Sequence, residues 1–156
     1  MLRRLARATT VLLVLLAASI LPAAHAQPLP LHLASATCPS AGVTLTTTSE
    51  TSAVTAPGIT TTGAQTIRVW GTAIITTGAA TTTVELRIRR GSGTAGTSIG
   101  TPTAVTVTAT NTVSVTFAAE DAPGEVAGQQ YSLTVQQASA TGNGTVAACE
   151  LSVMSF

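Results

Sequence analysis

The sequence is poor in charge, in aromatic side chains and in the residue types that catalyse reactions. Its 156 residues include no lysine, one tryptophan, one tyrosine, two phenylalanines and two histidines, and 8% of them are charged. A nucleic-acid binder needs several cationic side chains on one face to neutralise phosphates, so this composition argues against that class. Serine and cysteine nucleophiles need a neighbouring base, which the chain hardly offers. We therefore expect a protein that is not an enzyme, uses no cofactor and binds no nucleic acid.

The start of the sequence has the pattern of a secretory signal peptide. A basic start, MLRRLAR, precedes an apolar run over 11–21 and then Ala24-His25-Ala26, which fits the small-x-small cleavage rule. The run is too short for a membrane span, because that needs about 20 apolar residues. We expect residues 1–26 to form a signal-peptide helix that is cleaved near Ala26. The mature protein is then secreted, to the extracellular space or the periplasm.

Removal of this leader leaves four arginines against six carboxylates, a weakly acidic chain. No second apolar run is long enough to cross a membrane, so we expect no membrane span after cleavage. Residues 27–39 are expected to be an N-terminal leader, and 40–156 one domain with a core of its own.

Two cysteines, Cys38 and Cys149, remain in the exported chain. An even number of cysteines in an oxidising compartment favours a disulfide over two free thiols. Two distant thiols without clustered histidines do not make a metal site, so we expect none.

The pattern after the leader predicts strands throughout. About a fifth of the residues are threonine, which fits a pleated sheet better than a helix. In AVTVTATNTVSVTF, residues 104–117, apolar and hydroxyl side chains alternate on both sides of Asn111, which predicts a hairpin with one dry face. The spacing of the turns indicates an all-β fold, a single antiparallel β-sandwich of about seven or eight strands, either jelly-roll or immunoglobulin-like.

A second hairpin is predicted at the C-terminal end. A turn centred on Asn143 places Val135 opposite Leu151, and the same register sets Leu133 opposite Val153. Cys149 is in phase with Leu151, so it should point inward and reach Cys38 just before the first strand.

Every arginine after the leader lies in TIRVWGTAIITTGAATTTVELRIRR, residues 66–90. A four-residue loop at 77–80 makes this segment a hairpin with a small, apolar dry face. A loop of odd length would bury the guanidinium groups, at a high desolvation cost. The favoured register predicts one surface stripe, with Arg90 at the strand end and two cross-strand pairs: Arg68 with Arg89, and Trp70 with Arg87.

The stripe has a structural and a functional interpretation. Arginine stems can cover a threonine surface, and a cation–π contact of Trp70 with Arg87 contributes about 0.5–1 kcal/mol. Arg68 opposite Arg89 is an unfavourable like-charge pair, which needs an acidic partner: Glu85 on the same face, Glu150 from another strand, a neighbouring subunit or an anionic ligand. An aromatic ring beside arginine donors also suits a sugar. Both interpretations stay open, and the four residues are the candidate binding site.

Three carboxylates, Glu120, Asp121 and Glu125, surround a Pro-Gly turn. Calcium and glycosidic acid catalysis both use clustered carboxylates. No ladder of EF-hand type is present, and a solvated acidic turn is the favoured interpretation.

The order of elements resembles the jelly-roll heads of phage tail and fibre proteins, and also the tumour-necrosis-factor and complement-type globular heads. Those families carry a G-x-x-Y-x-L-x-V strand before a Gly/Asn turn and a last core strand, matched here by Gly128, Tyr131, Leu133 and Val135. The resemblance covers 40–156 and implies a non-catalytic head, often a homo-trimer, for attachment or display. The chain departs from the pattern because it has no fibre shaft and carries a disulfide.

These observations together predict a secreted, non-catalytic β-sandwich that acts as an extracellular structural, adhesive or binding protein with a surface glycan or protein as partner. The alternative is a glycan- or anion-binding module that uses the stripe of Arg68, Trp70, Arg87 and Arg89.

Overall fold

The computed structural model of this protein describes residues 31–45, 48–63, 65–138 and 143–156. The predicted signal peptide and the start of the predicted leader lie outside the described residues. Within the described ranges, no helix is long and apolar enough to cross a membrane.

The described part of the chain is built of strands. In chain order they are β1 (Leu31–Thr37), β2 (Val43–Leu45), β3 (Thr51–Thr61), β4 (Ile67–Thr77), β5 (Thr82–Arg90), β6 (Thr97–Val107), β7 (Thr112–Asp121), β8 (Val126–Gln137) and β9 (Gly144–Ser155). A short 3-10 helix, η1 (Gly93–Ala95), lies between β5 and β6.

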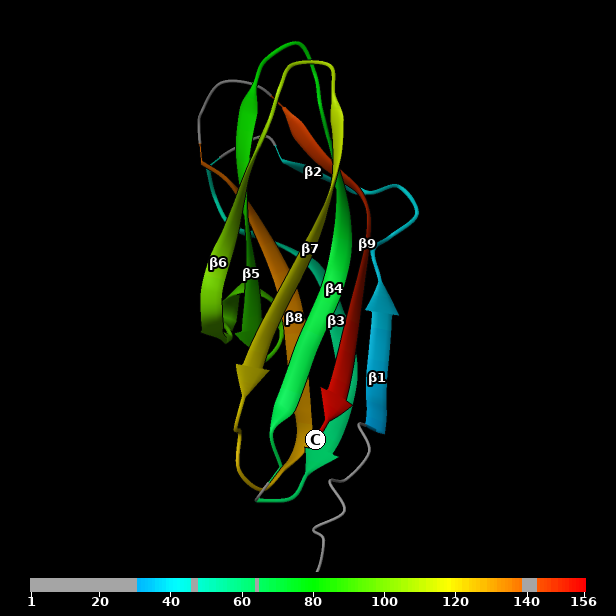
Figure 1. Cartoon of the computed structure of the whole chain (residues 1–156), viewed down its shortest axis with the longest axis vertical. Coiled ribbons are helices and arrows are strands. Elements are labelled where there is room, and N and C mark those ends of the chain that lie inside the picture. The colour runs from blue at the N-terminus through cyan, green and yellow to red at the C-terminus, as the bar shows by residue number, and fades with distance from the viewer. Residues whose placement is uncertain (1–30, 46–47, 64, 139–142) are drawn as a thin grey trace, which may run out of the picture.

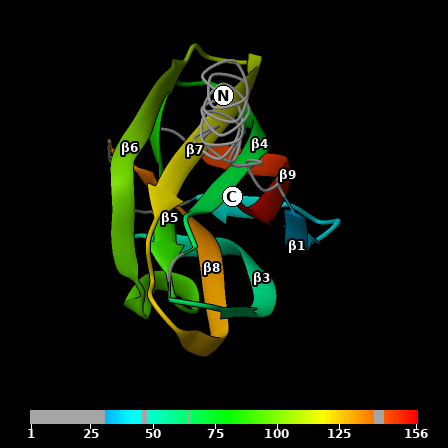
Figure 2. The ribbon, with the colours of Figure 1, turned by 60° about the horizontal axis from the view of Figure 1, so that its bottom comes forward.

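The strands form two antiparallel sheets that pack face to face (Figure 1 and Figure 2). The first sheet has the order β1–β9–β4–β7, with β2 also paired to β9, and the second sheet has the order β3–β8–β5–β6. Because β1 and β2 both pair with β9, they are two parts of one interrupted strand. Four strands then lie in each sheet in jelly-roll order. The predicted all-β sandwich is confirmed, and its topology is the jelly roll.

β1 lies in the segment that the sequence predicts to be a leader. It pairs with β9 from Leu31, opposite Ser155, to Thr37, opposite Glu150, with an irregularity between His32 and Ala34. That irregularity interrupts the alternation of side chains, and two prolines stand just before the strand, so the sequence pattern does not show it.

The predicted hairpins are wrong, although the strands in them are right. β4 and β5, β6 and β7, and β8 and β9 lie in different sheets, so each turn carries the chain across the core. Leu151 pairs with Gly71 instead of Val135, and Val135 pairs with Leu86. A strand turns its apolar residues to the core whether its sequence neighbour lies beside it or across from it, so alternation does not distinguish the two. Among the described strands, β5 and β6 are the consecutive pair that is hydrogen-bonded directly.

The core lies between the two sheets and is filled by alternate residues of the long strands. In β5, Val84, Leu86 and Ile88 are buried while the residues between them are partly exposed. The first sheet contributes the same alternation from β4, with Val69, Ala73 and Ile75 buried. Large fully buried side chains also include Tyr131, Leu45, Ile67, Leu133 and Leu151.

The predicted disulfide between Cys38 and Cys149 is confirmed. Cys38 follows β1, and its backbone N–H donates a hydrogen bond of 2.9 Å to the carbonyl of Cys149 in β9. The bond spans 111 residues of sequence and fastens the segment after β1 to the last strand.

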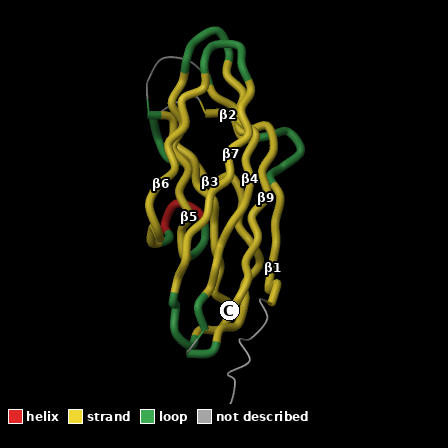
Figure 3. The backbone as a smooth tube through the Cα atoms, in the orientation of Figure 1, coloured by secondary structure: helices red, strands yellow, loops and turns green. Residues whose placement is uncertain are grey.

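Many of the connections gather at the two ends of an elongated sandwich (Figure 3). At one end the β4–β5 and β6–β7 turns bind each other. Thr77 N–H donates to Asn111 O at 3.1 Å, and Thr110 N–H donates to Gly78 O at 2.7 Å. These bonds fasten the two crossing turns to each other at this end of the sandwich.

Candidate functional site

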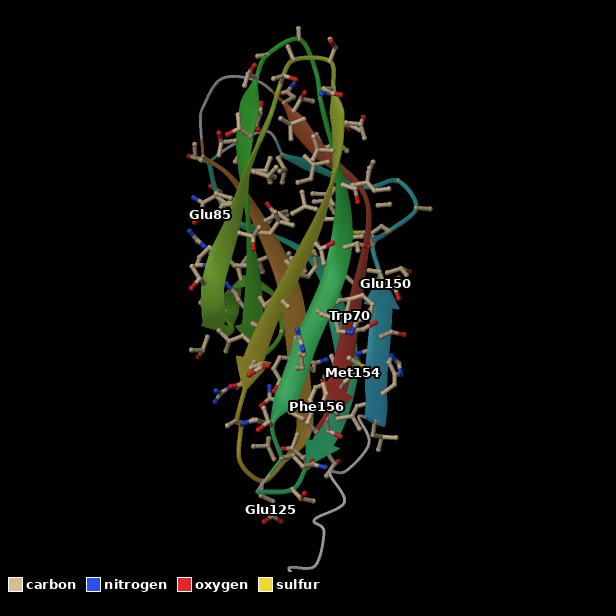
Figure 4. The ribbon with its side chains drawn as sticks, viewed as in Figure 1. Trp70, Glu85, Glu125, Glu150, Met154 and Phe156 are labelled. Carbon is tan, nitrogen blue, oxygen red and sulfur yellow. A yellow bond between two sulfur atoms is a disulfide. The ribbon has the colours of Figure 1, made fainter. Side chains whose placement is uncertain are left out.

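The structure divides the predicted stripe between the two sheets. Arg68 and Trp70 point outward from β4 in the first sheet, whereas Arg87 and Arg89 point outward from β5 in the second sheet. Figure 4 shows Glu85, an ion-pair partner of Arg87, well apart from Trp70. The predicted pairs of Trp70 with Arg87 and of Arg68 with Arg89 are therefore wrong, because the turn after β4 crosses the core.

The arginines of the second sheet form ion pairs with carboxylates of the same chain. Arg89 donates from Nε to Glu50 Oε1 at 2.7 Å and from Nη2 to Glu50 Oε2 at 2.5 Å. Arg87 Nη2 lies 2.6 Å from Glu85 Oε2, and Arg87 Nη1 lies 3.4 Å from Glu50 Oε2. The hydrogen bond from Arg89, helped by one from Thr134, holds the pKa of the Glu50 carboxyl below its usual value. Arg87 and Arg89 thus bind acids of the same chain, which leaves little capacity for an anionic ligand.

The structure places Asp121 apart from the other two carboxylates of the predicted acidic turn. Arg90 holds it through two hydrogen bonds, and Tyr131 Oη donates a third at 2.8 Å. Its neighbour Glu120 points outward from β7, and Glu125 lies in the turn before β8. Within the described residues, no group of three or more metal-ligating side chains is present.

Trp70 lies exposed on an inner strand of the first sheet. Its neighbours in the flanking strands are Ser152 on β9 and Ala118 on β7. Both side chains are small, and the indole keeps 36% of its surface exposed. Glu150, Trp70 and Met154 follow one another along this face (Figure 4). Such an indole presents a flat apolar ring together with an N–H donor.

Polar side chains border the indole on both sides along the strand. On one side, Arg68 is in register with Glu120 of β7. On the other side, Thr72 is in register with Glu150 of β9. The face therefore offers hydrogen-bond donors and acceptors around an apolar ring, which is the chemistry that a hydroxyl-rich ligand requires.

A hollow of about 340 Å³ is lined by Arg68, Ala118, Ala119 and Glu120, of which Ala118 is in register with Trp70. None of the ion pairs among the described residues includes Arg68. Its guanidinium can therefore donate to a molecule in the hollow, while Glu120 can accept. With Glu150 also on this face, the local charge disfavours an anionic ligand.

Comparison with known proteins shows no close relationship. No family model matches the sequence, and no curated protein matches it. Solved structures with a similar fold include a structure of infectious bursal disease virus, Gx strain, at 13% identity and a TM-score of 0.46 over 80% of this chain and 32% of that one.

Two other structures are covered over more than four fifths of their length. The EclA C-terminal domain, a sugar-binding protein, is 17% identical with a TM-score of 0.36 over 85% of this chain and 86% of that one. A family 16 carbohydrate-binding module is 11% identical with a TM-score of 0.32 over 74% of this chain and 82% of that one. This chain spans about a third of the length of the viral protein, and the likeness at these scores extends to the fold alone.

The sequence offers Glu150 as one possible acidic partner of the arginines, but it does not show that Glu120 and Glu150 border the strand of Trp70. Their alternation within β7 and β9 shows that they point outward. It does not show that β7 and β9 flank β4, since strand order depends on contacts between distant segments. The jelly-roll order supplies this strand arrangement, and the sequence left that order open beside the immunoglobulin-like one.

Proposed function

We propose that this protein acts outside the cytoplasm as a non-catalytic binding domain, and that its ligand is a glycan that stacks on Trp70. The observation that carries the proposal is the exposed indole on an inner strand of the first sheet, flanked by Ser152 and Ala118. The C–H face of a sugar ring packs on an aromatic ring, and its hydroxyl groups need donors and acceptors around the ring's edge. Arg68 and Glu120 supply them on one side of Trp70.

Export is supported by two independent features. The predicted signal peptide directs the chain out of the cytoplasm. The disulfide between Cys38 and Cys149 is of the kind that persists in an oxidising compartment.

A non-catalytic role is supported by the placement of the side chain best suited to act as a base. His32 is the one histidine after the predicted signal peptide. It lies on β1 at the edge of the first sheet, in register with Met154, and is exposed. A nucleophile would need such a base at hydrogen-bonding distance and an orienting group behind it.

The proposal is tested with an array of immobilised glycans and the purified protein. Trp70→Ala should lose binding to whatever glycans the unmodified protein retains, because the stacking surface is gone. Arg87→Ala on the second sheet should leave the same glycans bound. Circular dichroism and thermal melting verify that both variants fold. Retention of binding by Trp70→Ala, or no bound glycan at all, would refute the proposal.

A homo-trimer, which the resemblance to jelly-roll heads implies, stays a separate prediction. Light scattering on the purified protein tests it directly.

A further inference from the structure

A second hollow lies farther along the first sheet, beyond Trp70. It has a volume of about 410 Å³. Its floor is formed by Thr72 and Ile74 of β4 and by Ala148 and Glu150 of β9. We infer that this groove is a second sugar subsite, so that the ligand is a neutral oligosaccharide chain that runs along β4 from Trp70. The inference rests on the proposed function and specifies the length and charge of the ligand.

The groove and the indole belong to one continuous surface. Thr72 and Ile74 follow Trp70 at steps of two residues, so the three side chains leave β4 on the same face. Four residues of extended strand span about 13 Å, a length that roughly three sugar rings cover. When one sugar ring stacks on Trp70, the next rings of the oligosaccharide therefore lie over the groove.

The wall of the groove is held in place before any ligand arrives. It is formed by the segment from Thr37 to Ser40. The disulfide of Cys38 fastens this segment to β9, and the backbone of Gly42 donates a hydrogen bond of 2.8 Å to Pro39 O. A wall that is already ordered loses little conformational entropy on binding, which favours affinity.

The lining combines apolar and polar groups in the way that a sugar chain requires. Ile74 is 40% exposed and offers an apolar floor. Hydroxyl groups of Thr72, Thr37 and Ser40 and the Glu150 carboxylate surround it. With carboxylates at both ends of the face, Glu120 and Glu150, an acidic polysaccharide would be repelled, so the chain is neutral.

The experiment uses neutral β-1,4-linked gluco-, xylo- and manno-oligosaccharides of increasing length, from the monosaccharide upward, with the full mature protein. Trp70 is the chain's single tryptophan, so its fluorescence reports binding at the site without a label. Ala148→Phe fills the groove and leaves Trp70 unchanged. Ala104→Phe is the matched control, because Ala104 is an exposed residue of β6 in the other sheet.

The affinity of the unmodified protein should rise by about tenfold or more from the monosaccharide to the tetrasaccharide, as rings in the groove add contacts. Ala148→Phe should remove this gain and leave the monosaccharide affinity unchanged, while Ala104→Phe behaves like the unmodified protein. An affinity that does not depend on chain length, or a tetrasaccharide bound equally well by Ala148→Phe, overturns the second subsite but leaves Trp70 as a sugar site. If no oligosaccharide binds the unmodified protein, both the subsite and the proposed function fall.

Discussion

Arg90 on β5 and Asp121 on β7 form an ion pair that joins the two sheets of the sandwich. The Asp121 side chain is 4% exposed and that of Arg90 38% exposed, so the pair reaches from the interior to the surface. Tyr131 of β8 donates a hydrogen bond to the same carboxylate, which thereby links three strands. This network and the disulfide join distant parts of the chain by polar and covalent contacts, in addition to the hydrophobic packing of the core.

Removal of the Asp121 charge should destabilise the protein. We expect Asp121→Asn to lower the free energy of unfolding by about 2–3 kcal/mol, less than for a fully buried pair because Arg90 can reach water. Tyr131→Phe removes one hydrogen bond and keeps the ion pair, so it should cost about 1 kcal/mol. Urea denaturation followed by circular dichroism measures both. Equal stability of Asp121→Asn and the unmodified protein would contradict the role of the network.

Tyr131 should resist ionisation in the folded protein. Burial, followed by the hydrogen bond to Asp121, raises the pKa of its hydroxyl. Because the folded pKa is raised, the stabilisation is complete below the ordinary tyrosine value near pH 10 and is lost as the pH rises above it. The chain has one tyrosine, so the ultraviolet absorbance of tyrosinate follows this group alone. Ionisation should coincide with unfolding, and a tyrosinate signal at about pH 10 from folded protein would disagree with this environment.

Glu50 should make the stability depend on pH in the acidic range. Its hydrogen bond from Arg89 lowers its pKa, although burial opposes the shift. A lowered folded pKa contributes stability above the ordinary value, and that stability is lost as the pH falls through the folded pKa. We expect Glu50→Gln to lose about 2 kcal/mol at neutral pH. The loss should shrink below about pH 4, where the unfolded carboxyl is protonated. Urea melts of both proteins across this range measure the difference, and a loss that is constant with pH would show that the charge is unimportant.

Loss of the disulfide should destabilise the fold strongly. The Cys38–Cys149 bond closes a loop of 111 residues, for which chain entropy gives roughly 4–5 kcal/mol. We therefore expect the double variant Cys38→Ser, Cys149→Ser to melt well below the unmodified protein. The unmodified protein under reducing conditions is the matched comparison and should lose a similar amount. Thiol titration of unfolded, unreduced protein should find no free thiol, and two free thiols would show that the bond does not form.

Gly71, the single glycine of β4, should not tolerate a side chain. A Cβ at this position would lie 1.9 Å from the Glu150 carbonyl oxygen and 2.8 Å from the Phe117 ring. Gly71→Ala should thus force strands apart and cost more than about 3 kcal/mol. Gly78→Ala is the control, because its nearest neighbour would lie at 3.9 Å, and it should change stability little. Thermal melting compares the two variants. Similar stability of both would show that β4 and β9 lie farther apart than they do in this structure.

Part of the candidate site could be predicted from the sequence. The alternation of β4 places Trp70 and Arg68 on a wet face, and both lie there. The association of Trp70 with Arg87 failed, because residues that are near in sequence were assumed to share a sheet. Glu50, which binds Arg89, stands between β2 and β3 in a stretch without any regular pattern, so no local signal identifies it.

The sequence by itself determined the class of fold, the side of the long regular strands that faces the core and the pairing of the two cysteines. Each of these follows from local alternation or from composition. The tertiary structure alone decided that β7 and β9 flank β4, that Asp121 meets Arg90, and that the turns cross between the sheets. The physical reason is that the apolar face of a strand is buried equally well whether its sequence neighbour lies beside it in the same sheet or across from it in the other sheet. Only the packing of the whole core selects between these two arrangements.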